Sequence, residues 1–155
     1  FMKPLRNYSK PLRGMQGLFG DVRKYDIHTG IDLYCSPLEP VYTIEDGLIV
    51  NICDFTGKEA GSPWWNGTKA VLVEGKSGVI LYGEIVPSCH CEVGRKILEG
   101  TRIGNVITVL KKDKQRPMTM LHLELYKTGY RGDGEIWNLN ESQPFELLNP
   151  ESLLR

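Results

Sequence analysis

Histidine is scarce in this sequence, and neither sign of charge is in excess. The 155 residues include three histidines, and 19 Lys and Arg residues balance 19 Asp and Glu residues, so the formal net charge is zero. Because general affinity for nucleic acid or an anionic membrane surface needs a basic excess, we expect neither kind of partner. The length suits one domain, which we expect over residues 1–155, with an irregular arm at 1–26 and a loop-like tail at 138–155.

Long apolar runs are also absent. No stretch approaches the roughly 20 apolar residues of a membrane span, and the first residues form no apolar segment of the kind found in a secretory signal peptide. We therefore expect a protein without a membrane span or Sec signal. It would be cytoplasmic or released by another route, such as lysis of a phage-infected cell.

Cysteines are few and irregularly spaced. Without a signal peptide, Cys35, Cys53, Cys89 and Cys91 are expected to be reduced thiols rather than a disulfide framework. Cys89-His90-Cys91 superficially resembles a metal cluster, but zinc clamps usually space their cysteines by two to four residues. The pattern favours a surface loop.

Short β-rich runs separated by turn residues dominate what is present. Asp46-Gly47 between residues 41–44 and 48–52 predicts a hairpin, and residues 75–78 between runs 70–74 and 79–82 predict a second. Two more strands are expected at 105–110 and 120–126, whereas only 92–98 and 150–154 are weak helix candidates. These signals predict a mainly β, antiparallel sandwich or barrel-like fold.

The segment from His28 to Asp32 contains the first candidate metal ligands. Two ligands of one zinc ion lie about 3 to 4 Å apart, whereas four residues of extended strand span roughly 13 Å. Thr29, Gly30 and Ile31 disfavour a helix, so the chain must bend, and Gly30 can bend it. By itself this spacing is a weak signal, because a histidine and an aspartate in a turn are more often a local hydrogen-bonding pair than metal ligands.

The third candidate ligand is His122, in the expected strand 120–126. Strand alternation places three leucines on one face, at 121, 123 and 125, and His122 on the other with Glu124 and Tyr126. Glu124 lies about 7 Å further along the strand than His122, so we expect it to support the site or face solvent rather than bind metal. Two histidines and one aspartate would form an open site, as in catalytic zinc centres.

The order of these motifs resembles the LytM/lysostaphin-type zinc metallopeptidases. The matching segments are His28-x-Gly30-x-Asp32, Tyr82-Gly83-Glu84-Ile85, Val93-Gly94 to Ile103-Gly104 and Leu121-His122-Leu123-Glu124, and they extend over about residues 20–130. The resemblance implies a duplicated hybrid-motif β fold and hydrolysis of peptide bonds in peptidoglycan. It also implies Zn²⁺ bound by His28, Asp32 and His122.

Two positions depart from the family pattern, which has histidines where this chain has Met120 and Glu84. Both histidines normally position or deprotonate the attacking water. Methionine cannot replace them, but glutamate can act as a general base. Three roles remain open for Glu84: the base, a fourth zinc ligand, or a hydrogen-bond partner of a ligand histidine. Because Tyr82 and Glu84 alternate onto one face of a regular strand, Glu84 is expected in the groove with His122.

Candidate substrate contacts are aromatic. Tyr82 or Tyr126 could support the oxyanion, and Trp64-Trp65 could form a wall for a glycan or peptide, although the indoles could equally cap the core. The first hypothesis is thus a zinc metallopeptidase acting on peptidoglycan or a related peptide. The alternative is a catalytically inactive, zinc-stabilised binding or scaffold module. A third possibility, a lipoyl-type carrier domain, needs a lysine at the hairpin tip, and this chain has none there. The oligomeric state is not predicted.

Overall fold

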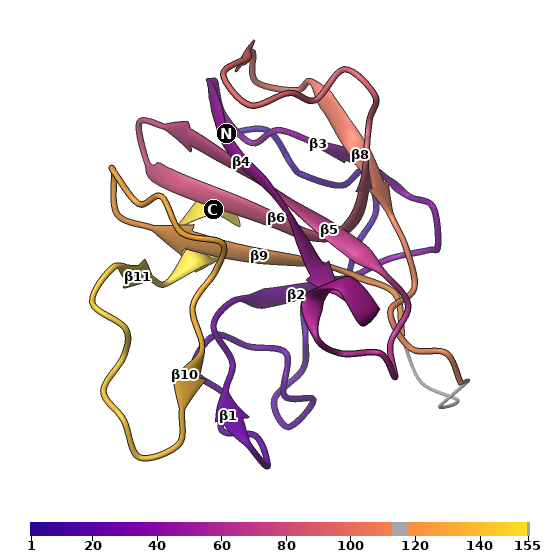
Figure 1. The fold of residues 1–155 in the computed structure, drawn as a ribbon, viewed down its shortest axis with the longest axis vertical. Coiled ribbons are helices and arrows are strands. Elements are labelled where there is room, and N and C mark those ends of the chain that lie inside the picture. Colours follow the sequence, from indigo (N-terminus) through magenta and orange to yellow (C-terminus); the bar gives the residue numbers. More distant parts are fainter. Residues whose placement is uncertain (113–117, 155) are drawn as a thin grey trace.

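The computed structural model describes residues 1–112 and 118–154, and nearly all its regular elements are β-strands (Figure 1). The strands are β1 Asp26–Ile27, β2 Ile31–Tyr34, β3 Pro40–Tyr42, β4 Gly47–Thr56, β5 Thr68–Gly75, β6 Gly78–Pro87, β7 Lys96–Ile97, β8 Arg102–Val106, β9 Met120–Tyr126, β10 Trp137–Asn138 and β11 Leu147–Leu148. The helices are the short 3-10 turns η1 Lys58–Ala60 and η2 Pro150–Leu154. The predicted mainly β class is confirmed. No helix among the described residues is long and apolar enough to cross a membrane.

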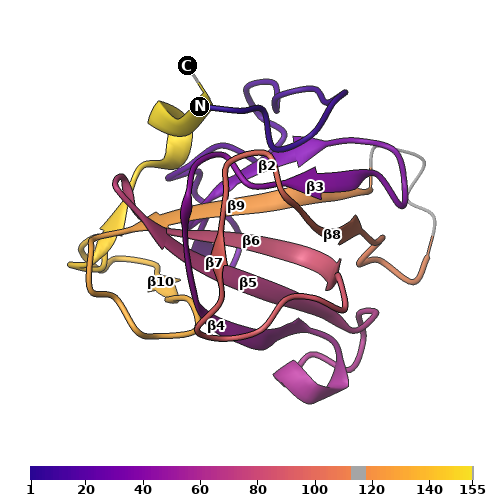
Figure 2. The ribbon, with the colours of Figure 1, turned by 90° about the horizontal axis from the view of Figure 1, so that it is seen from above.

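One large antiparallel sheet organises the molecule. Its strands follow the order β11-β9-β6-β5-β4-β7, while β2 pairs with β9 and β8 pairs with both β3 and β6. The long strands β4, β5, β6 and β9 lie side by side across the molecule, and β1 and β10 form a separate two-stranded ribbon (Figures 1 and 2). Strand β9 is therefore joined to β6 along one edge and to β2 and β11 along the other.

The predicted hairpin at residues 75–78 is confirmed, with Gly75 opposite Gly78 in the β5–β6 pair. The predicted hairpin at Asp46-Gly47 is wrong, because β3 pairs with β8 whereas β4 pairs with β5 and β7. Two contacts explain this. The Thr43 N–H donates to the Thr101 carbonyl, and the Glu45 carboxylate accepts from the Ser77 N–H at 3.0 Å. The turn thus holds the chain to distant strands.

Other predicted elements differ from the structure in position or type. The strand expected at 105–110 is β8, at 102–106, and segment 92–98 contains turns and β7 rather than a helix. The tail contains β11, and the weak helix candidate at 150–154 is the 3-10 helix η2. The four cysteines are free, as expected.

Alternation along β9 places its leucines in the main core. Leu121, Leu123 and Leu125 pack there, as predicted, with Ile80 and Tyr82 of β6. Leu5 of the N-terminal arm and Leu153 of η2 join the same cluster, and both chain ends lie on that side of the sheet (Figure 2). A smaller cluster covers the other face.

Candidate metal centre

Three side chains form the candidate metal centre, two from a pair of hydrogen-bonded strands and one from the segment just before them. His28 directly follows β1, Asp32 lies in β2, and His122 lies in β9. Asp32 and His122 stand directly opposite each other in the antiparallel β2–β9 pair. Because opposite residues of such a pair project to the same face, sheet register alone brings these two side chains together.

Gly30 lets the bend between His28 and Asp32 approach β9. A Cβ atom at Gly30 would overlap the Leu123 carbonyl oxygen and lie 2.9 Å from Nε2 of His122. The glycine is therefore required for the close approach of two backbones, as well as for the bend expected from the sequence.

The three candidate ligand atoms form a compact triangle. Nε2 of His28 lies 3.3 Å from Oδ1 of Asp32 and 3.3 Å from Nδ1 of His122, and the last two atoms lie 2.9 Å apart. Tetrahedral ligands at zinc bond lengths of about 2.0–2.1 Å are separated by about 3.3 Å. All three side chains are buried, and they form the only such cluster of three or more His, Cys, Asp or Glu residues in ranges 1–112 and 118–154. The donor set and its spacing fit a zinc ion.

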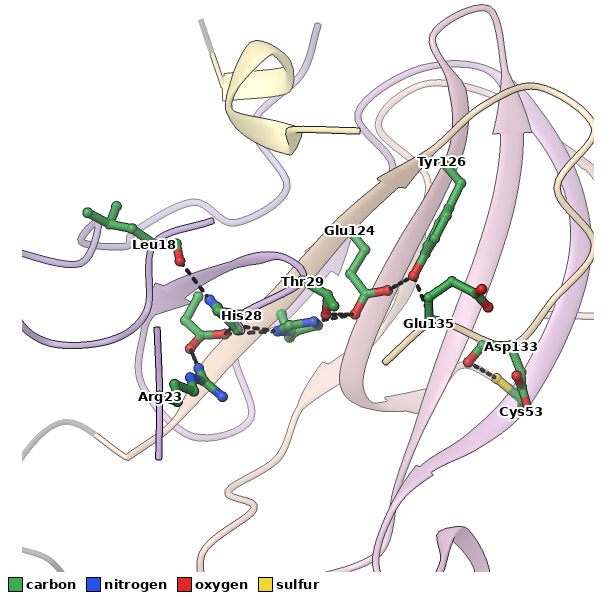
Figure 3. A network of polar contacts seen from close by, with 12 residues as sticks. Leu18, Arg23, His28, Thr29, Cys53, Glu124, Tyr126, Asp133 and Glu135 are labelled. Carbon is green, nitrogen blue, oxygen red and sulfur yellow. Dashed lines mark hydrogen bonds and ion pairs between the residues drawn. The ribbon is translucent and has the colours of Figure 1, made fainter. Parts of the chain in front are cut away.

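The remaining ring nitrogens of the two histidines have partners that point those rings at the triangle (Figure 3). Nδ1 of His28 lies 3.0 Å from the Leu18 carbonyl oxygen, which can only accept, so this nitrogen carries the proton and Nε2 is left for the metal. Nε2 of His122 lies 2.6 Å from Oε2 of Glu124, which leaves Nδ1 facing Asp32 and His28.

Hydrogen bonds within the cluster shift the pKa values of Asp32 and His122 in the metal-free protein. Burial would raise the pKa of Asp32, but hydrogen bonds with His122 and His28 outweigh it and lower the pKa below its ordinary value. Burial would lower the pKa of His122, but hydrogen bonds with Asp32 and Glu124 raise it to about 10. At neutral pH His122 is therefore charged, and a metal at Nδ1 would take the place of a proton.

Glu84 occupies a β-bulge beside this cluster. In the β5–β6 pair Ala70 faces Gly83 and Lys69 faces Ile85, so Glu84 has no opposite residue, and its φ is 65°. The bulge breaks the alternation that underlies the predicted shared face of Tyr82 and Glu84. Burial raises the pKa of Glu84 to about 8, and the Asp32 charge adds to this, while the charges of His122 and Arg23 oppose it.

The Oε2 atom of Glu84 is buried without a hydrogen-bond partner among the described residues. A buried carboxylate oxygen normally has a partner, and an orphaned one is a sign of a bound water, an ion or a catalytic role. An unsatisfied oxygen in the electric field of Asp32 and His122 is the feature expected of a base or a further ligand at this centre.

Glu124 and Arg23 complete the polar surroundings (Figure 3). Besides His122, Glu124 accepts hydrogen bonds from the hydroxyls of Thr29 and Tyr126. An Arg23 guanidinium nitrogen lies 3.4 Å from Oδ2 of Asp32, the carboxylate oxygen outside the triangle. The position of Glu124 agrees with the expected supporting role. No sequence signal identifies Arg23, because its contact depends on how the N-terminal arm packs.

The aromatic residues predicted to contact substrate do not gather at the triangle. Tyr82 and Tyr126 are fully buried, and the Tyr82 hydroxyl accepts the Ile44 N–H at 2.9 Å. Trp64 and Trp65 are 63% and 38% exposed, and Trp65 lines a cavity of about 770 Å³ to which no residue of the triangle contributes. Met120 is half-buried, two residues before His122 in β9.

Comparisons with known proteins give likeness of fold alone. No family model and no curated protein matches the sequence. Among solved structures, a variant of the catalytic domain of the prophage-encoded M23 protein EnpA from Enterococcus faecalis aligns with a TM-score of 0.60 at 17% identity, over 94% of this chain and 91% of that one. The catalytic domain of the antimicrobial peptidase lysostaphin from Staphylococcus simulans aligns with a TM-score of 0.56 at 18% identity, over 95% and 92%.

A longer protein aligns as well. A candidate M23 peptidase from Pseudomonas aeruginosa gives a TM-score of 0.57 at 15% identity, and the match covers 99% of this chain but only 49% of that one. The chain thus spans about half of that protein. These alignments confirm that the chain has the LytM/lysostaphin-type fold that its motifs indicate.

Proposed function

We propose that this chain, built on the LytM/lysostaphin-type fold, is a zinc-dependent peptidase that cleaves peptide bonds of peptidoglycan or a related peptide. The observation that carries the proposal is the triangle of His28 Nε2, Asp32 Oδ1 and His122 Nδ1, with sides of 2.9–3.3 Å. Both histidine rings are held by hydrogen bonds that leave the required nitrogen facing inward.

The chain's own residues would divide the work as follows. Bound zinc supplies Lewis acidity, which polarises a carbonyl and lowers the pKa of water. The Glu84 carboxyl, whose ionised form is favoured beside a bound dication, would then accept the proton of the attacking water on its unpartnered Oε2 atom and later deliver it to the leaving amine. Arg23 binds the outer oxygen of Asp32 and so keeps Oδ1 as the oxygen turned to the triangle.

The substrate class is inferred from the fold. The aligned structures include a peptidase, lysostaphin, and the catalytic domain of a prophage-encoded M23 protein. We therefore assign peptidoglycan stem or cross-bridge peptides as the first substrates to test. The exposed Trp64 and the half-exposed Trp65 are proposed as an aromatic wall for such a peptide.

The decisive experiment measures zinc content and cleavage together. Purified protein is loaded with Zn²⁺ and incubated with peptidoglycan and a panel of oligopeptides, and Asp32→Asn and His90→Ala are treated in the same way. His90 is the matched control, because its Nε2 bonds to the Arg102 carbonyl, outside the cluster. The proposal expects one zinc per chain and cleavage in the wild type and His90→Ala, and neither in Asp32→Asn. Absence of cleavage by the zinc-loaded wild type would overturn it.

Glu84→Gln separates the roles open to Glu84. Loss of a general base should lower kcat at least about 100-fold while zinc affinity stays near the wild-type value. Loss of a fourth ligand should instead weaken zinc binding directly.

A second candidate function is favoured by Met120 and Glu84, which stand where the resemblance implies helper histidines. If Glu84 ligates zinc, the centre has four protein ligands, as structural sites do, and the chain is a zinc-stabilised binding module. Zinc binding with a raised melting temperature, but no turnover on any substrate, is the outcome that supports this function.

A further inference from the structure

The carboxylate of Glu124 lies behind the candidate metal ligand His122 and is held by three hydrogen bonds. Glu124 lies two residues after His122 in β9, on the same face of the strand, and is only 2% exposed. Its Oε2 atom accepts from Nε2 of His122 at 2.6 Å and from the Thr29 hydroxyl at 2.8 Å. Its Oε1 atom accepts from the Tyr126 hydroxyl. A buried carboxylate with three donors has little freedom to turn.

The donors to Glu124 are themselves fixed. The Tyr126 hydroxyl accepts the Glu135 N–H at 2.8 Å (Figure 3). The Tyr126 ring stacks on that of Tyr130, with centroids 3.9 Å apart. Burial raises the pKa of Tyr126, so the phenol keeps the proton that it donates. Thr29 belongs to the bend between His28 and Asp32 and so links Glu124 to the other two candidate ligands.

We infer that Glu124 is the positioning residue of the metal centre: held by Thr29 and Tyr126, it keeps the proton of His122 on Nε2 and the ring turned so that Nδ1 binds the metal. This inference rests on the proposed zinc site, but not on catalysis. Carboxylate partners of ligand histidines commonly contribute about 10- to 100-fold in metal affinity. Glu124 would thus act through His122 without touching the metal.

The loop after β9 also supports the metal centre. It is connected to the candidate ligand His122 through two residues, because the Glu135 N–H donates to the Tyr126 hydroxyl and that hydroxyl donates to Glu124. The loop is anchored in turn at the sheet by a double contact of Arg131 with the Glu74 carboxylate, each at 3.0 Å. Substitutions well away from the ligands are therefore expected to alter zinc affinity.

The experiment compares zinc dissociation constants, measured by competition with a chelator, for the wild type and three variants. Glu124→Gln offers one acceptor oxygen to three donors and should bind zinc about 10- to 100-fold more weakly. Tyr126→Phe removes one donor and should weaken binding by a smaller factor. Tyr25→Phe is the matched control, because Tyr25 is 79% exposed and lies outside the network that holds Glu124. It should bind zinc as the wild type does.

A second readout reports the proton directly. Nitrogen-15 histidine spectra of the zinc-loaded protein should show a protonated Nε2 for His122 in the wild type and in Tyr25→Phe, with a shifted resonance in Glu124→Gln and in Tyr126→Phe. Equal zinc affinities and unmoved resonances in all variants would overturn the inference. If Glu124→Gln does not fold, the zinc affinities and spectra of Tyr126→Phe and Tyr25→Phe are compared instead, and a difference between them supports the inference. A wild type that binds no zinc would instead contradict the proposed function.

Discussion

Gly30 lies directly against the imidazole of His122: an added Cβ would be 2.9 Å from both Nε2 and Cε1 of the ring. The contact joins the bend that presents His28 and Asp32 to the strand that presents His122. Backbone contact between these two segments is thus the basis of the whole centre.

Gly30→Ala should damage both stability and zinc binding. The new methyl group also overlaps the Leu123 carbonyl, so β2 and β9 must separate, at a cost of about 2 kcal/mol in the free energy of unfolding. Urea denaturation and zinc titration check this. Gly67→Ala is the control, because a Cβ there meets nothing closer than 4.0 Å. Equal behaviour of the two variants would contradict the argument.

Metal removal should lower the melting temperature. A ligand present at about 100 times its dissociation constant stabilises the folded state by about 2.7 kcal/mol, which corresponds to roughly 5–10 °C for a chain of this size. Calorimetry with Zn²⁺ and with a chelator measures the difference. Asp32→Asn should abolish it and His90→Ala should retain it. A chelator effect of the same size in Asp32→Asn would show that zinc binds elsewhere.

The stability of the metal-free protein should depend on pH through Glu84. Its folded-state pKa is raised to about 8, against about 4.3 for an ordinary glutamate. The stabilising contribution is therefore fully present below the unfolded pKa and is lost as pH rises through about 8. Glu84→Gln, which stays neutral, should gain stability relative to the wild type between about pH 5 and about pH 9. Urea denaturation with chelator present tests this, and Glu59→Gln, at an exposed position, should show no such trend.

Tyr82→Phe should affect folding rather than chemistry. The Tyr82 hydroxyl is the partner of the buried Ile44 N–H, and loss of a buried partner costs about 2 kcal/mol. Denaturation measures the loss. The KM for any cleaved peptide should stay unchanged, and a raised KM would restore the substrate role that the sequence predicts. Tyr25→Phe, at a side chain that is 79% exposed, should leave stability unaltered.

The local patterns of the sequence predict β9 and the β5–β6 hairpin well. Alternation in residues 120–126 separates the core leucines from His122, and glycines at 75 and 78 mark a tight turn. Both signals lie within a few neighbouring residues, where hydrophobic period and turn chemistry are decisive. The three candidate ligands that the motifs indicate are also brought together.

What the sequence does not predict depends on distant contacts. Asp46-Gly47 has the composition of a hairpin turn, but the preceding backbone pairs with residues near Thr101 instead. The bulge at Glu84 depends on the register of β5 against β6, which no local pattern encodes. Arg23 reaches the centre through packing of the N-terminal arm, and the Glu135 N–H reaches Tyr126 through packing of a loop, so these two contacts are visible only in three dimensions.

A metal bound by the three candidate ligands would connect distant parts of the chain. His28 and His122 are 94 residues apart, and Asp32 and His122 are 90 apart, although Asp32 and His122 lie opposite each other in paired strands. An ion held by all three ties the start of the chain to its last long strand and closes a loop that spans most of the protein. Closing so long a loop removes much of the freedom of the unfolded chain, so the ion would act as a reversible cross-link, comparable to a disulfide that a chelator can open.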